Sequence, residues 1–188
     1  MNMPERHVNL DFVIDTNRIN AKTHLKNMNI LERWKNDDVI SLEMPEVAQK
    51  EAFQGGNANR ADKARSYVGF IAGSDDSPFV KRNKIAKILY PSGIQNNSQR
   101  NDVEIVFTAG KRVGWILITD DGDSKSQPAG ILGNKDALDA IGIKVMRDHE
   151  AVELVQQKIM DRDEHAKRIA QMEGKSLPEW VGKDVLSQ

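Results

Sequence analysis

Acidic side chains stand at four separate points of the chain, each at an end of an apolar run. They are Asp15 in DFVIDTN, Glu51 in MPEVAQKEA, Asp102 in RNDVEIVF, and Asp120, Asp121 and Asp123 in WILITDDGDS. Because carboxylates that converge repel and desolvate one another, a fold tolerates them mainly where a divalent cation neutralises them. Oxygen ligands select hard ions, so the pattern indicates a phosphodiesterase that depends on Mg²⁺ or Mn²⁺.

Other kinds of reactive site have little support in the composition. The chain has no cysteine, which excludes a disulfide framework and a thiolate metal site. Its 4 histidines have neither i, i+4 nor H-E-x-x-H spacing, so a zinc site is not indicated. Taken alone, Asp15 could be only a helix cap or a turn residue, since Asp commonly follows a strand for that reason.

Two short apolar segments must position the first and last of these acids. Residues 8–14 and 115–119 are predicted to be buried strands, and Asp15 and the group of Asp120, Asp121 and Asp123 follow them directly. In open α/β sheets, ligand sites lie beyond the carboxyl ends of such strands. The acids are therefore expected to converge at one edge of a sheet.

The remaining elements alternate between strand and helix. We predict strands at residues 39–44 and 143–146. A first helix is expected to end at Trp34, and further helices are expected at residues 46–53, 58–72 and 134–141. Residues 91–100 are expected to be a loop, after which Asn101 caps a helix with Asp102 in its first turn. This order predicts a three-layer α/β fold, a central parallel sheet with helices on both faces.

The length of 188 residues suits one domain with an appendage. We assign the domain to residues 1–148 and a C-terminal helical extension to residues 149–188. The extension has an apolar stripe at helical spacing: Val152, Val155, Ile159, Ala166 and Ile169. This stripe packs on its own domain, or else forms an interface with a protein partner or a second copy of the chain.

The net charge of −1 gives no overall attraction to nucleic acid, so any such attraction must be local. The strongest basic cluster is Lys81, Arg82, Lys84 and Lys87, with a weaker one at Arg60, Lys63 and Arg65. Either cluster could follow a phosphate backbone or be an ordinary solvated helix face. No apolar run is long enough for a signal peptide or a membrane span, so we expect a cytoplasmic protein without membrane contact.

With these residues identified, the chain resembles the PIN-domain nucleases, a family that includes VapC-type toxin ribonucleases and RNA-processing endonucleases. The resemblance covers about residues 8–147. Its strongest parts are the first strand ending in Asp15-Thr16-Asn17, the Asn101-Asp102 helix start, and Thr119-Asp120-Asp121-Gly122-Asp123. The family's last motif, Thr-x-Asp-x-Asp, carries over to Asp121 and Asp123 and leaves Asp120 as a spare acid. The family's helix-borne Glu often lies six residues after a strand-ending proline, which favours Glu51 over Glu46.

The resemblance implies an endoribonuclease that uses one or two Mg²⁺ or Mn²⁺ ions and leaves a 5′-phosphate and a 3′-hydroxyl. Asp15, Asp102 and Asp121 would then hold a metal, and Glu51 and Asp123 would orient its water or complete a second site. Thr16, Asn17 and Thr119 would be polar supports of these ligands. The substrate would be single-stranded or structured RNA, and toxin-type relatives often bind an inhibitory protein.

Three other interpretations remain open. A Toprim-like nicking domain would match Asp121 and Asp123, but it needs a Glu after its first strand, where this chain has Asp15. A phosphatase of the haloacid-dehalogenase type needs a second Asp at position 17, which is Asn. A PIN-like fold without turnover could serve as a binding or scaffold module.

Overall fold

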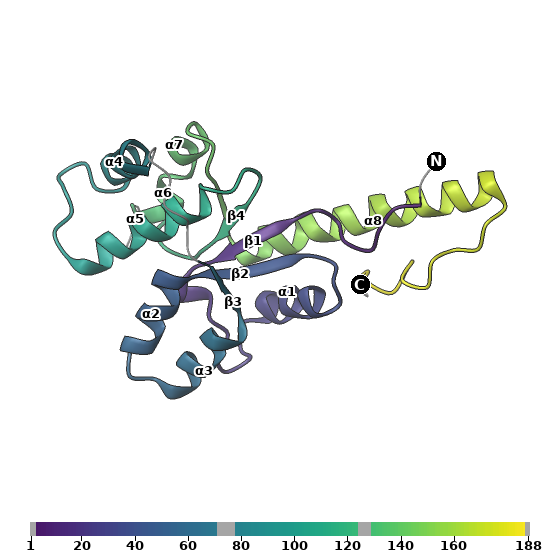
Figure 1. The fold of residues 1–188 in the computed structure, drawn as a ribbon, viewed down its shortest axis with the longest axis horizontal. Helices are drawn as coiled ribbons and strands as arrows, with labels where there is room; N and C mark the ends of the chain where they lie inside the picture. The colour runs from purple at the N-terminus through teal and green to yellow at the C-terminus, as the bar shows by residue number, and fades with distance from the viewer. Residues whose placement is uncertain (1–2, 71–77, 124–128, 187–188) are drawn as a thin grey trace.

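Five parallel strands form the central sheet of the protein, in the order β3-β2-β1-β4-β5 (Figure 1). The structure is a computed structural model, and it describes residues 3–70, 78–123 and 129–186. The strands are β1 (Asp11–Ile14), β2 (Ser41–Pro45), β3 (Val68–Phe70), β4 (Ile116–Ile118) and β5 (Lys144–Met146). Every adjacent pair among them is parallel.

The strand order creates a switch point between β1 and β4. From β1 the chain builds outward through β2 to β3, and it then returns to the other side of β1 to form β4 and β5. Ile14, the last residue of β1, pairs with Ile118, the last residue of β4. Residues that follow these two strands therefore meet at the position where open α/β sheets usually bind their ligands.

Helices cover both faces of the sheet, so the predicted three-layer α/β fold is confirmed. The helical segments are η1 (Thr16–Arg18), α1 (Lys26–Asn36), α2 (Glu46–Gln54), α3 (Ala58–Ser66), α4 (Pro78–Leu89), α5 (Asn97–Ala109), α6 (Gly130–Gly133), α7 (Lys135–Asp139) and α8 (Asp148–Glu173). Helix α1 packs on β2 and on α8, whereas α5 packs on β2, β4, α2 and α4. Because both layers bury the middle of the sheet, β4 is a continuous apolar run and β1 is apolar after its first residue. Phe12, Val13 and Ile14 of β1 are all 0 % exposed.

Two predicted elements differ from the structure. The helix expected at residues 58–72 ends at Ser66 and is followed by strand β3, while residues 71–72 lie outside the described residues. The helix expected to start at Asn101 starts at Asn97, and Asn96 caps it by accepting a hydrogen bond of 3.0 Å from the N–H of Gln99. Asp102 therefore lies in the second turn of α5 and not in the first.

Helix α8 extends beyond the sheet, and the chain then turns back beside it (Figure 1). Gly174 ends the helix in the left-handed conformation, with φ 64°. Trp34 of α1 donates a hydrogen bond of 2.9 Å from Nε1 to the carbonyl of Asp184, which ties the returning segment to the domain. The boundary between residues 148 and 149 remains a prediction. Within the described residues, no helix combines the length and the apolar character that crossing a membrane requires.

Candidate metal centre

Asp15 lies directly after β1 and is held by three donors. Its Oδ1 accepts a hydrogen bond of 2.5 Å from the N–H of Thr16. Its Oδ2 accepts from Thr119 Oγ1 at 2.6 Å and from Asn17 Nδ2 at 2.7 Å. The carboxylate is only 4 % exposed, and the hydrogen bonds fix its orientation between β1 and β4.

Glu51 reaches the same region from α2. Thr16 Oγ1 donates a hydrogen bond of 2.7 Å to Glu51 Oε2, so one threonine contacts Asp15 through its backbone and Glu51 through its side chain. The helix that carries Glu51 begins where β2 ends, with Pro45 as its N-cap. Because β2 neighbours β1, this helix starts beside the end of β1.

Asp102 belongs to α5, and a tyrosine orients it. The hydroxyl of Tyr90, the residue after α4, donates a hydrogen bond to Asp102 Oδ2. Among the described residues, Oδ1 of Asp102 has no hydrogen-bond donor. This oxygen can therefore bind a ligand without losing an internal contact.

Asp121 follows β4 in a tightly closed loop. Its Oδ2 accepts a hydrogen bond of 3.0 Å from the N–H of Ile131, and its carbonyl accepts one of 2.8 Å from the N–H of Leu132. A side chain at Gly130, whose φ is 90°, would bring a Cβ within 2.6 Å of Asp121 Oδ2. Glycine is thus required there for the loop to hold this carboxylate.

The carboxylates of Asp15, Glu51, Asp102 and Asp121 lie close enough to act on one another. Burial raises the pKa of Asp15 to about 6, and the charges of Asp121 and Glu51 add to this increase against the hydrogen bonds from Thr119 and Thr16. Burial also raises the pKa of Asp102 to about 7, opposed by the Tyr90 hydrogen bond and reinforced by the charges of Asp15, Asp121 and Glu51. The structure therefore brings together acids from four segments of the chain.

Three acids of this cluster, Asp15, Glu51 and Asp102, lack a cationic partner among the described residues. No lysine, arginine or histidine nitrogen of that part of the chain lies within 4.0 Å of their carboxylates. Asp120 and Asp123 differ from them. Asp120 contacts Arg18 at 3.2 Å and also pairs with Arg147, and the Asp123 carboxylate lies 3.6 Å from the same arginine.

The donor set suits a hard divalent cation, although the side chains do not surround an ion as they stand. All candidate ligands are carboxylate oxygens, the type that Mg²⁺ and Mn²⁺ prefer. The part of the chain that the structure describes contains no group of three His, Cys, Asp or Glu side chains arranged to hold a metal. The carboxylates of Asp15 and Asp121 accept hydrogen bonds from protein donors instead. Asp15 and Asp102, with raised pKa values and no cationic partner among the described residues, nevertheless form an environment that a divalent ion would stabilise.

The basic cluster predicted on α4 is partly used within the protein. Arg82 forms two hydrogen bonds with Glu104, of 2.7 and 3.0 Å, and lies over the ring of Phe107 at 4.0 Å. Lys81 donates to the carbonyl of Gly110. Lys84 and Lys87 are exposed, so they are the two members of the cluster most available to a phosphate backbone.

Tyr90, Arg18 and Arg147 were not predicted from the sequence as parts of this centre. Tyr90 precedes Asp102 by 12 residues, and Arg147 lies 27 residues after Asp120. Nothing in their local sequence indicates these contacts, since the fold alone brings them together.

Comparison with known proteins adds no family to this description. The sequence matches no profile of a known protein family, and no curated protein matches it.

Proposed function

We propose that the protein is a divalent-metal-dependent endoribonuclease of the PIN type. The observation that carries this proposal is the cluster of Asp15, Glu51, Asp102 and Asp121 at the switch point of the sheet. Asp15 is buried and Asp102 is half-buried, and neither has a cationic partner among the described residues. Structural acids are normally neutralised by lysine or arginine, whereas strongly perturbed acids in a crevice are typical of functional sites.

In the proposed mechanism, Asp15, Asp102 and Asp121 would hold the cation. A Mg²⁺ or Mn²⁺ ion there would supply an acidified water and charge stabilisation at the phosphate. Thr119 and Asn17 hold Asp15 in place, and Tyr90 holds Asp102 through one oxygen while the other remains available. Glu51, oriented by Thr16, accepts a proton from the attacking water. Asp123 would orient the attacking water or complete a second metal site, and this role would compete with its contact to Arg147.

The products expected from attack of water on the phosphorus are a 5′-phosphate and a 3′-hydroxyl. No covalent intermediate with the protein is required, because water is the nucleophile. The proposal also includes a cytoplasmic location, where single-stranded RNA is present. Whether an inhibitory protein binds the enzyme, as in toxin–antitoxin pairs, is a separate question that binding experiments must answer.

The direct test is the cleavage of a single-stranded RNA with Mg²⁺ or Mn²⁺, with chelator, and with an Asp102→Asn variant. We expect chelator to abolish cleavage and the variant to lower the rate by about 100-fold or more, which is about 3 kcal/mol of transition-state stabilisation. Asp139→Asn is a matched control, because Asp139 is an exposed acid on α7. It should cleave at the normal rate.

Two results would reject the proposal. If Asp102→Asn cleaves as fast as Asp139→Asn, the cluster is not the catalytic centre. If the purified protein binds RNA but never cleaves it, the fold serves as a binding module. Nicking of DNA in place of RNA would favour a nuclease of the Toprim type.

A further inference from the structure

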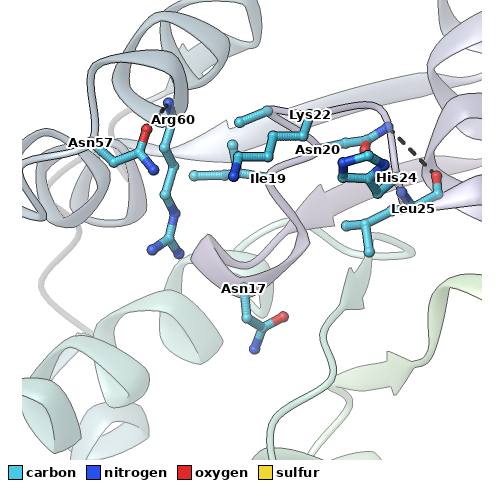
Figure 2. A pocket seen from close by; sticks show the side chains of 9 residues that line it. Asn17, Ile19, Asn20, Lys22, His24, Leu25, Asn57 and Arg60 are labelled. Carbon is cyan, nitrogen blue, oxygen red and sulfur yellow. Dashed lines mark hydrogen bonds between the residues drawn. The ribbon is translucent and has the colours of Figure 1, made fainter.

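A pocket of about 300 Å³ lies beside the candidate metal centre. This volume is at the lower end of the range for small-molecule sites. Figure 2 shows Arg60 and Asn57 on the α3 side of the pocket, and the other residues on the segment that follows β1. Six polar residues line it: Asn17, Asn20, Lys22, His24, Asn57 and Arg60. The lining contains cationic and amide side chains and no acidic one.

The cations of the pocket have no ion-pair partner in the part of the chain that the structure describes. There, neither Lys22 nor Arg60 has a carboxylate within 4.0 Å. Among the described residues, the side chain of Arg60 makes one hydrogen bond, from Nη2 to the carbonyl of Thr16 at 2.7 Å. This bond fixes the guanidinium and leaves its other N–H groups available for an anion.

Internal hydrogen bonds hold two asparagines of the lining in place. Asn20 is 2 % exposed, and it accepts a bond of 3.1 Å from the N–H of Leu25 and donates one of 2.6 Å to Asn29 Oδ1. Asn57 caps α3 by accepting a bond of 3.1 Å from the N–H of Arg60. The loop and the helix start are thus fixed before any ligand binds, which reduces the entropy that binding would cost.

Thr16 and Asn17 connect the pocket to the carboxylates. Arg60 binds the carbonyl of Thr16, while the N–H and hydroxyl of the same threonine bind Asp15 and Glu51. Asn17 lines the pocket and donates to Asp15 Oδ2 at 2.7 Å. Residues that line the pocket therefore make direct hydrogen bonds to residues of the proposed reaction centre.

We propose that this pocket binds one nucleotide of a single-stranded RNA, next to the bond that is cleaved. Lys22 and Arg60 bind its phosphate, and His24 and the asparagine amides contact its sugar and base. The choice of RNA rests on the proposed function, whereas the affinity for a nucleotide rests on the pocket alone. Because Asn17 lines the pocket and contacts Asp15, an RNA strand bound here would lie next to the carboxylates.

The test measures binding without metal, so that it does not depend on cleavage. A short fluorescent oligouridine is titrated with the protein in chelator, and anisotropy is recorded over a series of salt concentrations. We expect Lys22→Gln and Arg60→Gln each to raise Kd by about tenfold, and each to reduce the salt slope by about 0.7. The control is Arg65→Gln, since Arg65 lies on the same helix as Arg60 and pairs with Asp62 at the surface. It should leave both quantities unchanged.

The outcomes separate the pocket from the enzyme activity. If the wild type does not bind, or if Lys22→Gln and Arg65→Gln behave alike, the inference is overturned. Among the described residues, the Lys22 side chain is exposed and makes no hydrogen bond or ion pair, so this variant decides the question even if Arg60→Gln does not fold. RNA that is bound through Lys22 but not cleaved with Mg²⁺ or Mn²⁺ would support the pocket and refute the proposed function.

Competition identifies what the pocket recognises. Uridine 5′-monophosphate should displace the oligouridine at a concentration about tenfold lower than inorganic phosphate does, since it adds the base and sugar contacts. Equal displacement by the two would mean that the pocket reads only an anion, and it would overturn the nucleotide assignment. Displacement by polyglutamate at the concentration of the nucleotide would indicate an acidic protein segment instead.

Discussion

Two acidic clusters that contain buried carboxylates lie in different parts of this molecule, and these carboxylates have different partners. Where α8 packs against the returning C-terminal segment, Asp163 and Asp184 are 4 % and 2 % exposed, and Arg162 contacts them at 2.7 and 3.1 Å. Arg6 adds a second contact to Asp184 at 2.6 Å. At the ends of β1 and β4, Asp15 is equally buried, but its partners are neutral donors.

The difference separates a structural role from a functional one. A buried carboxylate that only supports the fold needs a fixed counter-charge, since desolvation otherwise makes its ionised form costly. The C-terminal cluster has this counter-charge in the protein itself. At the strand ends, Asp15 and Asp102 have no such counter-charge within the part of the chain that the structure describes, which is the expected arrangement if the counter-charge is a metal ion taken from solution.

Removal of the internal counter-charge should have the largest effect on stability. Arg162→Met leaves Asp163 and Asp184 buried with much less compensation, so we expect the free energy of unfolding to fall by about 3–5 kcal/mol. Urea denaturation followed by circular dichroism measures this quantity. Arg168→Met, a replacement of an exposed arginine on α8, should change it by less than about 0.5 kcal/mol. Equal effects of the two changes would remove the contrast between the clusters.

Addition of a divalent ion should stabilise the folded protein, and only by binding to the cluster at the strand ends. At about 100 times its Kd, Mn²⁺ should raise the stability of the folded protein by about 2.7 kcal/mol. Because the pKa values of Asp15 and Asp102 are about 6 and about 7, protons compete with the ion in acid. The increase in melting temperature should therefore be larger at about pH 8 than at about pH 5. An increase that persists in Asp102→Asn would show that the ion binds elsewhere.

Without metal, the charge of Asp15 should oppose folding. Its pKa rises from 3.8 to about 6 in the folded state, so the ionised form is disfavoured there. The penalty is absent below about pH 4, grows as the pH rises, and is complete above about pH 6. Asp15→Asn should therefore raise the free energy of unfolding by about 1–2 kcal/mol at about pH 7.5, after allowance for a lost acceptor.

Denaturation in chelator at about pH 7.5 and pH 4 checks this sign. The gain from Asp15→Asn should be much smaller at the lower pH, where Asp15 is protonated in the folded state and about half protonated in the unfolded state. A loss of stability at the higher pH would mean that Asp15 is a structural acid like Asp184.

The smallest effect should come from Tyr90→Phe. The change removes the hydroxyl that donates to Asp102, at a cost of about 1 kcal/mol in stability. Since this hydrogen bond lowers the pKa of Asp102, its loss should raise that pKa further. The acid side of the pH–rate profile for RNA cleavage should then move to higher pH. A lower rate without any movement of the profile would indicate a packing role for Tyr90.

The sequence predicts the elements whose signals are local. Apolar runs identified β1, β2, β4 and β5, although the strands are shorter than expected, and helical spacing with Gly174 identified α8. Strand β3 was missed because Val68–Phe70 has only 3 residues and depends on pairing with β2, a contact distant in sequence. The start of α5 is not predicted from the sequence because residues 95–100 are polar, as loops usually are. Asn96 is nevertheless a residue type that commonly caps helices.

For the site, sequence reasoning could select residue types but not their neighbours. Thr16, Asn17 and Thr119 were expected to support the acids, and each of them hydrogen-bonds Asp15 or Glu51 in the structure. The pairing of Asp120 with Arg18 and Arg147 could not be predicted, because it joins residues 102 and 27 positions apart. The pocket lined by Lys22 and Arg60 could not be predicted for the same reason, because these residues are distant in sequence. Whether the acids bind a metal remains a prediction.

The central claim is that one cation completes the cluster at the ends of β1 and β4. The most direct measurement is a crystal structure with Mn²⁺, in which anomalous scattering locates the ion. We predict a Mn²⁺ bound by Asp15, Asp102 and Asp121, with the Asp15 and Asp121 carboxylates turned away from their present donors. Saturating Mn²⁺ with no ion at these three side chains, or with an ion only at Asp120 and Asp123, would contradict this account.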